Sequence, residues 1–179
     1  MLFGVIIVNI FAAVWCELGM SHLPMANAAR ALPPMISLWL VVAGARALRR
    51  LPARDRAEAK RIGRLIGIWA GAEGAAMLVT APILGMLGLQ ADILPALAII
   101  VGLHFVPLAH GIPCKPYYAV AAAMILAAAV ALALPAADRA PVSGIASGVA
   151  LWVSVVLRIR QEEGRVFFFE KKNQKTFTS

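Results

Sequence analysis

Three polar side chains interrupt the long apolar runs of this 179-residue chain: Asn9, Glu73 and His104. A carboxyl group and an imidazole can both gain and lose protons under physiological conditions when their surroundings shift their pKa values. Ionisable side chains inside a bilayer are costly, and they often mark an ion or proton pathway. These residues therefore indicate a site that handles a proton or a cation, with Glu73 changing its protonation state and His104 as its partner or relay.

The alternative interpretation is that the same side chains only fix how helices pack. Neutral Glu73, His104 and Asn9 would then form hydrogen bonds between helices, each contributing about 1 kcal/mol or less.

At about 1.5 Å of rise per residue, all three lie within roughly 5 Å of the centres of their apolar runs, on the same side. We expect them to share one layer, with His110 at the nearer water boundary and Glu17 towards the opposite one.

We further expect Glu73 and His104 to be neighbours, because a short connection joins their two apolar runs. A turn at Gln90 to Asp92 leaves Glu73 and His104 at 17 and 12 residues from its edges. The difference of five residues corresponds to about 7.5 Å along a helix. The pairing therefore requires a tilted helix, a turn that begins early near Gly85 to Gly88, or both.

The composition identifies the class of protein. Hydrophobic residues make up 61% of the chain and charged residues 15%, and the mean hydropathy is +0.82. A soluble domain does not have this balance. The net charge of +8 does not indicate nucleic-acid binding, because the basic residues lie between apolar runs without interleaved aromatic residues. We expect the lipid bilayer as the partner and no nucleic acid.

The apolar runs predict an all-α polytopic membrane protein with six transmembrane helices in three hairpins, forming one domain over residues 1–165. The six predicted spans are residues 2–20, 32–48, 65–89, 93–110, 116–134 and 141–158. The remaining residues, 166–179, differ in composition from the rest of the chain. We expect this tail to be unstructured or poorly ordered.

The distribution of Lys and Arg predicts the orientation. With the 46–64 connection in the cytoplasm, only Arg30 and Arg139 of the 17 basic residues fall outside. The others are eight residues in that connection, Lys115, and six from Arg158 onward. Basic residues concentrate on the cytoplasmic side of membrane proteins. We therefore expect both termini in the cytoplasm and a multi-pass protein of the bacterial inner membrane.

Catalytic and metal-binding motifs are missing from the sequence. Cys16 and Cys114 fall on opposite sides of the predicted membrane, so they cannot form a disulfide with each other. Neither has the Cys or His spacing of a zinc site, and no phosphate-binding loop or nucleophile motif is present. We expect no enzymatic activity, no catalytic residue, no metal and no cofactor.

Small residues recur at helical spacing in two segments. Gly67, Gly71 and Gly74 form one set, and Gly144 and Gly148 form another. Such faces allow helices to approach closely. We expect them to pack within the bundle, and a homo-oligomer formed through these faces is the alternative.

A longer block, AIIVGLHFVPLAHGIPCKPYYAVAAAMILA, together with the upstream AEGAAM, carries a family resemblance. It resembles a group of small bacterial six-helix integral membrane proteins with a Gly-Leu-His-Phe-x-Pro-Leu-Ala signature and no assigned biochemical role. The resemblance covers Leu65 to Leu134 and implies the six-helix fold, but no activity, cofactor or site residue. His110 stands where this group usually has an aromatic residue.

The sequence thus predicts a small transporter or an ion- or proton-coupled membrane protein that uses Glu73 and His104, with an unidentified small molecule or ion as substrate. The second candidate is a non-enzymatic structural or partner-binding membrane subunit, in which the same residues only specify packing. A membrane-embedded enzyme is the third.

The charge distribution gives a first test. Topology reporters fused after Arg61 and after Arg160 should both read cytoplasmic, and a reporter fused after Arg139 should read external. A reversed reading at any of these points would show that the number of predicted spans is wrong.

Overall fold

The computed structural model describes residues 2–25, 27–49, 55–112 and 116–176. In these ranges all regular structure is α-helical and no β-strand occurs, as the sequence predicts. The helices are α1 (Leu2–Met20), α2 (Asn27–Arg30), α3 (Leu32–Leu48), α4 (Arg56–Met86), α5 (Gln90–Gly111), α6 (Pro116–Leu132) and α7 (Ala136–Thr176).

Four stretches of the described chain are long and apolar enough to cross a membrane. They are Ala28–Ala47, which joins α2 and α3, Arg56–Met86 in α4, Gln90–Gly111 in α5, and Ala136–Gln161 in α7. Helices α1 and α6 are also apolar but shorter. These lengths and compositions are those of an α-helical membrane protein.

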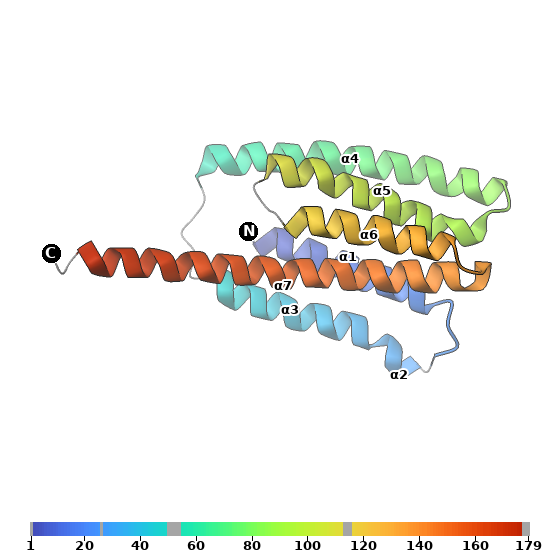
Figure 1. Ribbon diagram of the computed structural model, residues 1–179, viewed down its shortest axis with the longest axis horizontal. Coiled ribbons are helices and arrows are strands. Elements are labelled where there is room, and N and C mark those ends of the chain that lie inside the picture. The colour runs from blue at the N-terminus through green and yellow to red at the C-terminus, as the bar shows by residue number, and fades with distance from the viewer. Residues whose placement is uncertain (1, 26, 50–54, 113–115, 177–179) are drawn as a thin grey trace.

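The long helices lie side by side and successive ones run in opposite directions (Figure 1). Helix α4 lies at one edge of the bundle next to α5, and α3 lies at the other edge next to α1 and α7. Helix α1 begins and α7 ends towards the same end of the molecule. We call this the basic end, because it carries the described basic side chains Arg46, Arg49, Arg56, Lys60, Arg61, Arg64, Arg158 and Arg160.

The start of α4 differs from the sequence prediction. The predicted span begins at Leu65, whereas the helix begins at Arg56 with Asp55 as its N-cap. The Asp55 carboxylate accepts a hydrogen bond from the backbone N–H of Glu58 over 3.4 Å. Residues 56–64 are rich in Ala, Glu, Lys and Arg, which favour helix in water as well as in a bilayer. Apolarity therefore marks only the inner part of this helix.

The turn between α4 and α5 also lies elsewhere than predicted. Gln90 to Asp92 form the first turn of α5, and the chain reverses at Leu87 to Leu89. Gly88 has a φ of +76°, a left-handed conformation that glycine adopts without steric cost. Asp92 is favourable in its actual position, because a carboxylate stabilises the N-terminus of a helix.

Helix α7 continues beyond the predicted sixth span. It starts at Ala136 rather than at residue 141 and runs to Thr176, so residues 166–176, predicted to be unstructured or poorly ordered, are helical. Pro141 lies in the second turn, where it cannot donate a backbone hydrogen bond to Ala137, and the helix continues through it. The tail contains Glu, Gln and Lys, which have high helix propensity once a helix is already nucleated.

At the end opposite the basic end, an ion pair joins α5 to α7. The Nη1 of Arg139 donates to the Oδ1 of Asp92, and its Nε donates to the backbone oxygen of Leu134 over 3.0 Å. Both side chains are less than one-third exposed. The pair fixes the start of α7 against the start of α5.

Helices α1 and α7 make the most extensive contact in the bundle, and glycines set how close they come. A Cβ atom on Gly144 would lie 2.6 Å from the Cα of Gly19, and one on Gly19 would lie 2.8 Å from the backbone nitrogen of Ile145. A Cβ on Gly148 would lie 2.7 Å from the backbone oxygen of Ala12. The prediction that Gly144 and Gly148 pack within the bundle is confirmed.

This contact gives a stability test. Gly144→Ala should lower the free energy of unfolding by about 1–3 kcal/mol, because the added methyl group forces two helix backbones apart. Gly67→Ala is the control, since a Cβ there meets nothing within 4 Å and alanine is the better helix former. Denaturant titration in detergent, followed by circular dichroism, measures both. Equal effects of the two substitutions would contradict the close packing of α1 on α7.

Candidate functional site

Glu73 and His104 face each other across the interface between α4 and α5. The Nδ1 of His104 lies 3.2 Å from the Oε2 of Glu73. The side chain of Glu73 is 14% exposed and that of His104 is 10% exposed, so both are largely buried. The prediction that these two residues are neighbours is confirmed.

The position of the α4–α5 turn brings the pair to the same depth. Glu73 lies 13 residues before Met86, the end of α4, and His104 lies 14 residues after Gln90, the start of α5. Each is therefore about 20 Å along its helix from the turn. The sequence allowed either a tilted helix or an early turn. The structure has the early turn, and Gly88 forms it.

The neighbouring residues fix the ring of His104. Phe105 meets it edge to face with ring centroids 5.7 Å apart, and the ring of Phe105 in turn lies 5.5 Å from that of Tyr117 on α6. Phe105 and Tyr117 are both buried. Helix α5 continues past Pro107 to Gly111, so the proline does not end it.

The contact between Glu73 and His104 has the distance of an ion pair but not the angle of a hydrogen bond. Among the described residues, Nδ1 of His104 has no hydrogen-bond partner of acceptable geometry. At 3.2 Å, the two groups are within the distance over which an imidazole and a carboxyl group can pass a proton between them.

Asn9 does not join this pair, although the sequence predicts one layer for all three residues. Its helix, α1, packs mainly against α7 and α3, whereas the pair lies between α4 and α5. The fully buried Asn9 donates from Nδ2 to the backbone oxygen of Val5 over 2.9 Å. Its Oδ1 has no hydrogen-bond partner among the described residues. Asn9 thus supports helix packing at some distance from Glu73 and His104.

A second polar contact, which the sequence reasoning missed, joins three helices near Asn9. Ser37 of α3 donates to the backbone oxygen of Asn9 over 2.8 Å, and Trp152 of α7 donates from Nε1 to the Ser37 hydroxyl over 2.9 Å. Two signals in the sequence could have indicated this contact: a serine inside an apolar run, and a tryptophan in another run whose N–H needs an acceptor away from water. This chain of hydrogen bonds holds α3 to α1 and α7.

The remaining predicted polar residues lie away from the pair. His110 is exposed near the basic end, and Glu17 is partly exposed near the other end of α1. Cys16 is buried against α7, with Sγ 3.9 Å from the backbone oxygen of Ile145. Cys114 lies outside the described residues. Among the described residues, no group of three His, Cys, Asp or Glu side chains is arranged to hold a metal ion.

Comparisons of the chain with protein-family models, with curated proteins and with solved structures gave no match in any of the three. The resemblance to small six-helix membrane proteins therefore stays a prediction from the sequence.

The pair gives a second stability test. His104→Leu should lower the free energy of unfolding by about 1–3 kcal/mol, because it leaves the largely buried Glu73 carboxyl without its partner. His110→Leu is the matched control and should change it by less than about 0.5 kcal/mol, as is usual for an exposed position. Denaturant titration in detergent measures both variants.

The double variant Glu73→Leu/His104→Leu provides a further check. Removing both partners leaves no stranded polar group, so it should recover most of the loss seen with His104→Leu alone. A double variant as unstable as the single one would show that the carboxyl does not depend on His104.

Proposed function

We propose that this chain is a proton-coupled membrane protein in which Glu73 and His104 form the proton-handling site. The observation that carries the proposal is their 3.2 Å contact at the α4–α5 interface, within two apolar helices. A bilayer-embedded carboxyl beside an imidazole is an arrangement used to accept, hold and release protons. No catalytic role is part of the proposal.

The proposed topology has six spans in three hairpins, with both termini in the cytoplasm of a bacterium and the protein in its inner membrane. The alternating helix directions and the common end at which α1 begins and α7 ends support it (Figure 1). The charge distribution supports it too, because the basic end carries most of the described Lys and Arg side chains. In this topology α1 and α6 span the membrane although they are short.

The chemistry of the pair favours a proton over a larger solute. Among the described residues, one carboxylate and one imidazole meet at the site, and both side chains are largely buried. A bare Na⁺ or Ca²⁺ needs several oxygen ligands, whereas a proton needs one acceptor at a time. Glu73 would take up the proton, and His104 would stabilise the carboxylate when the proton leaves.

The second candidate is a partner-binding membrane subunit, and one observation favours it. A Cβ on any of Gly67, Gly71 or Gly74 would meet nothing within 4 Å, so this face of α4 is not used inside the bundle. The sequence predicted that these glycines pack within the bundle, and here that prediction is wrong, since α4 has an extended contact only with α5 in the described chain. A second copy of the chain could pack there, as expected for a small-residue face.

Proton flux tests the proposal directly. The purified full-length protein would be reconstituted into liposomes that contain a pH-sensitive dye, and a membrane potential would be imposed with potassium and valinomycin. The wild-type protein should acidify or alkalinise the lumen according to the sign of the potential. Glu73→Gln should reduce the rate to that of protein-free liposomes, because the amide cannot take up the proton.

Glu17→Gln is the matched control, since Glu17 lies in an apolar helix but far from His104, and it should keep the wild-type rate. If the wild-type protein carries no flux under either sign of potential, Glu73 and His104 do not conduct protons on their own, and the partner-binding candidate is favoured.

A further inference from the structure

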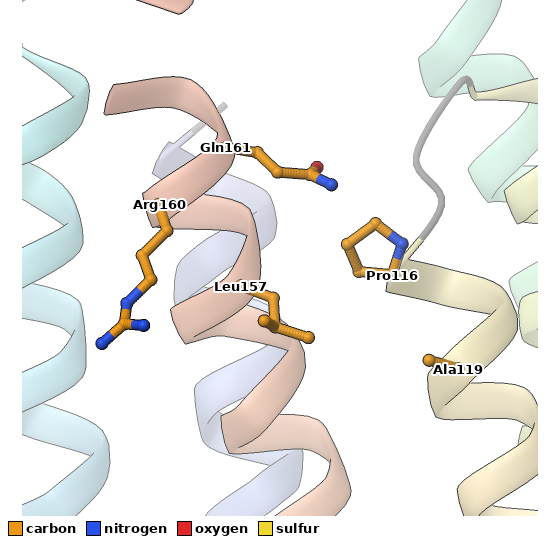
Figure 2. Close-up of a pocket in the computed structure, with 5 residues that line it drawn as sticks. All are labelled: Pro116, Ala119, Leu157, Arg160 and Gln161. Atoms are coloured by element: carbon orange, nitrogen blue, oxygen red, sulfur yellow. The ribbon is translucent and has the colours of Figure 1, made fainter. Parts of the chain in front are cut away.

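An open groove with a volume of about 440 Å³ lies between the first turn of α6 and α7 at the basic end (Figure 2). We call it the α6–α7 groove, and its lining residues are Pro116, Ala119, Leu157, Arg160 and Gln161. It is separate from Glu73 and His104, which come from α4 and α5.

The groove has an apolar wall and a polar end. Figure 2 shows Leu157 and Gln161 extending from α7 towards α6, opposite Pro116 and Ala119. The guanidinium of Arg160 extends to the other side of α7. Its side chain is long, with several rotatable bonds, so its charge can reach the mouth of the groove.

The polar groups at the groove are available for a ligand. Within the described part of the chain, Arg160 and Gln161 make no hydrogen bond or ion pair. The first turn of α6, at Pro116, adds the partial positive charge of a helix N-terminus. The charge of Arg160 and this helix N-terminus favour an anion, and the Gln161 amide can donate a hydrogen bond to it.

The neighbouring Arg158 has a different role. Its Nη1 donates to the hydroxyl of Tyr117 over 2.6 Å, and its guanidinium carbon lies 5.8 Å from the centre of the Tyr117 ring. This contact ties α7 to the first turn of α6. The two walls of the groove are therefore held in place, while the charge of Arg160 is not engaged.

An exposed apolar surface continues from the groove towards the middle of the bundle. On α7, Val153 and Val149 follow Leu157 at one-turn intervals, and they are 50% and 45% exposed. On α6, Ala123 and Leu126 follow Ala119 on the same face, and both are exposed. A ligand that fits both parts has an anionic head and a long apolar chain.

We infer that the α6–α7 groove binds an anionic phospholipid. The headgroup phosphate accepts hydrogen bonds from Gln161 and, once its side chain turns towards α6, from Arg160, and an acyl chain lies along Leu157, Val153 and Val149. Basic pockets between transmembrane helices on the cytoplasmic side are suited to such headgroups. The apolar surface would add no binding energy for a free phosphate ion, and the arginine would add little for a neutral phospholipid.

The test measures phospholipid retained by the full-length protein. The protein would be purified in a mild detergent with added phosphatidylglycerol or phosphatidylcholine, and bound lipid would be counted by native mass spectrometry. The wild-type protein should retain phosphatidylglycerol in preference to phosphatidylcholine. Arg160→Ala should lower retained phosphatidylglycerol about five-fold, the factor that corresponds to the roughly 1 kcal/mol contributed by one basic residue at an anionic surface.

Two further variants separate the groove from general surface charge. Arg56→Ala removes an exposed arginine at the same end, on α4, and should leave retention unchanged. Ala119→Trp fills the groove without altering charge, and it should lower retention as much as Arg160→Ala does. Both positions are exposed, so the fold should tolerate the changes, which circular dichroism would verify.

Inorganic phosphate at millimolar concentration should not displace the bound phosphatidylglycerol. Equal losses in Arg56→Ala and Arg160→Ala, full retention in Ala119→Trp, or displacement by phosphate would each overturn the inference. The readout is independent of proton flux, so this result and the test of Glu73 do not affect each other.

Discussion

The close approach of α1 and α7 is the constraint on which the rest of the bundle depends. Helix α7 also packs against α3, α5 and α6, so its distance from α1 determines where those helices can lie. Glycines at positions 19, 144 and 148 allow backbone-to-backbone contact that no larger residue would permit. In a bilayer, where apolar surface gains little by leaving lipid, such packing and a few hydrogen bonds supply most of the association energy. The Ser37 hydroxyl and the Arg139–Asp92 pair then fix α3 and α5 to this centre.

The candidate site lies outside this centre, and a different feature sets its geometry. The reversal at Gly88 determines which residue of α4 stands opposite His104, because antiparallel helices joined by a short turn keep equal lengths on both sides. A turn three residues later would place Glu73 about 7.5 Å from the imidazole along the helix axis. The contact between the two side chains therefore depends on a single left-handed glycine about 20 Å away along each helix.

Much of this arrangement could be predicted from the sequence, and the failures have physical causes. Apolar length located α1 and α3 at their observed bounds, and similar depth in two runs joined by a short connection paired Glu73 with His104. Depth alone could not show that Asn9 belongs to a different helix interface, because depth along a helix axis says nothing about which helices are neighbours. Gln90 and Asp92 suggested a turn because polar residues are common there, yet they are equally suited to begin a helix. Apolarity also could not locate the ends of α4 and α7, since both helices continue through charged residues.

The peripheral position of α4 has a mechanical consequence. Because its extended contact in the described chain is with α5 alone, displacing α4 disrupts one helix interface, while displacing any helix at the centre would disrupt several. The attraction between Glu73 and His104 acts across that same interface, and it changes whenever either group gains or loses a proton. Any movement of α4 away from α5 would therefore separate Glu73 from His104.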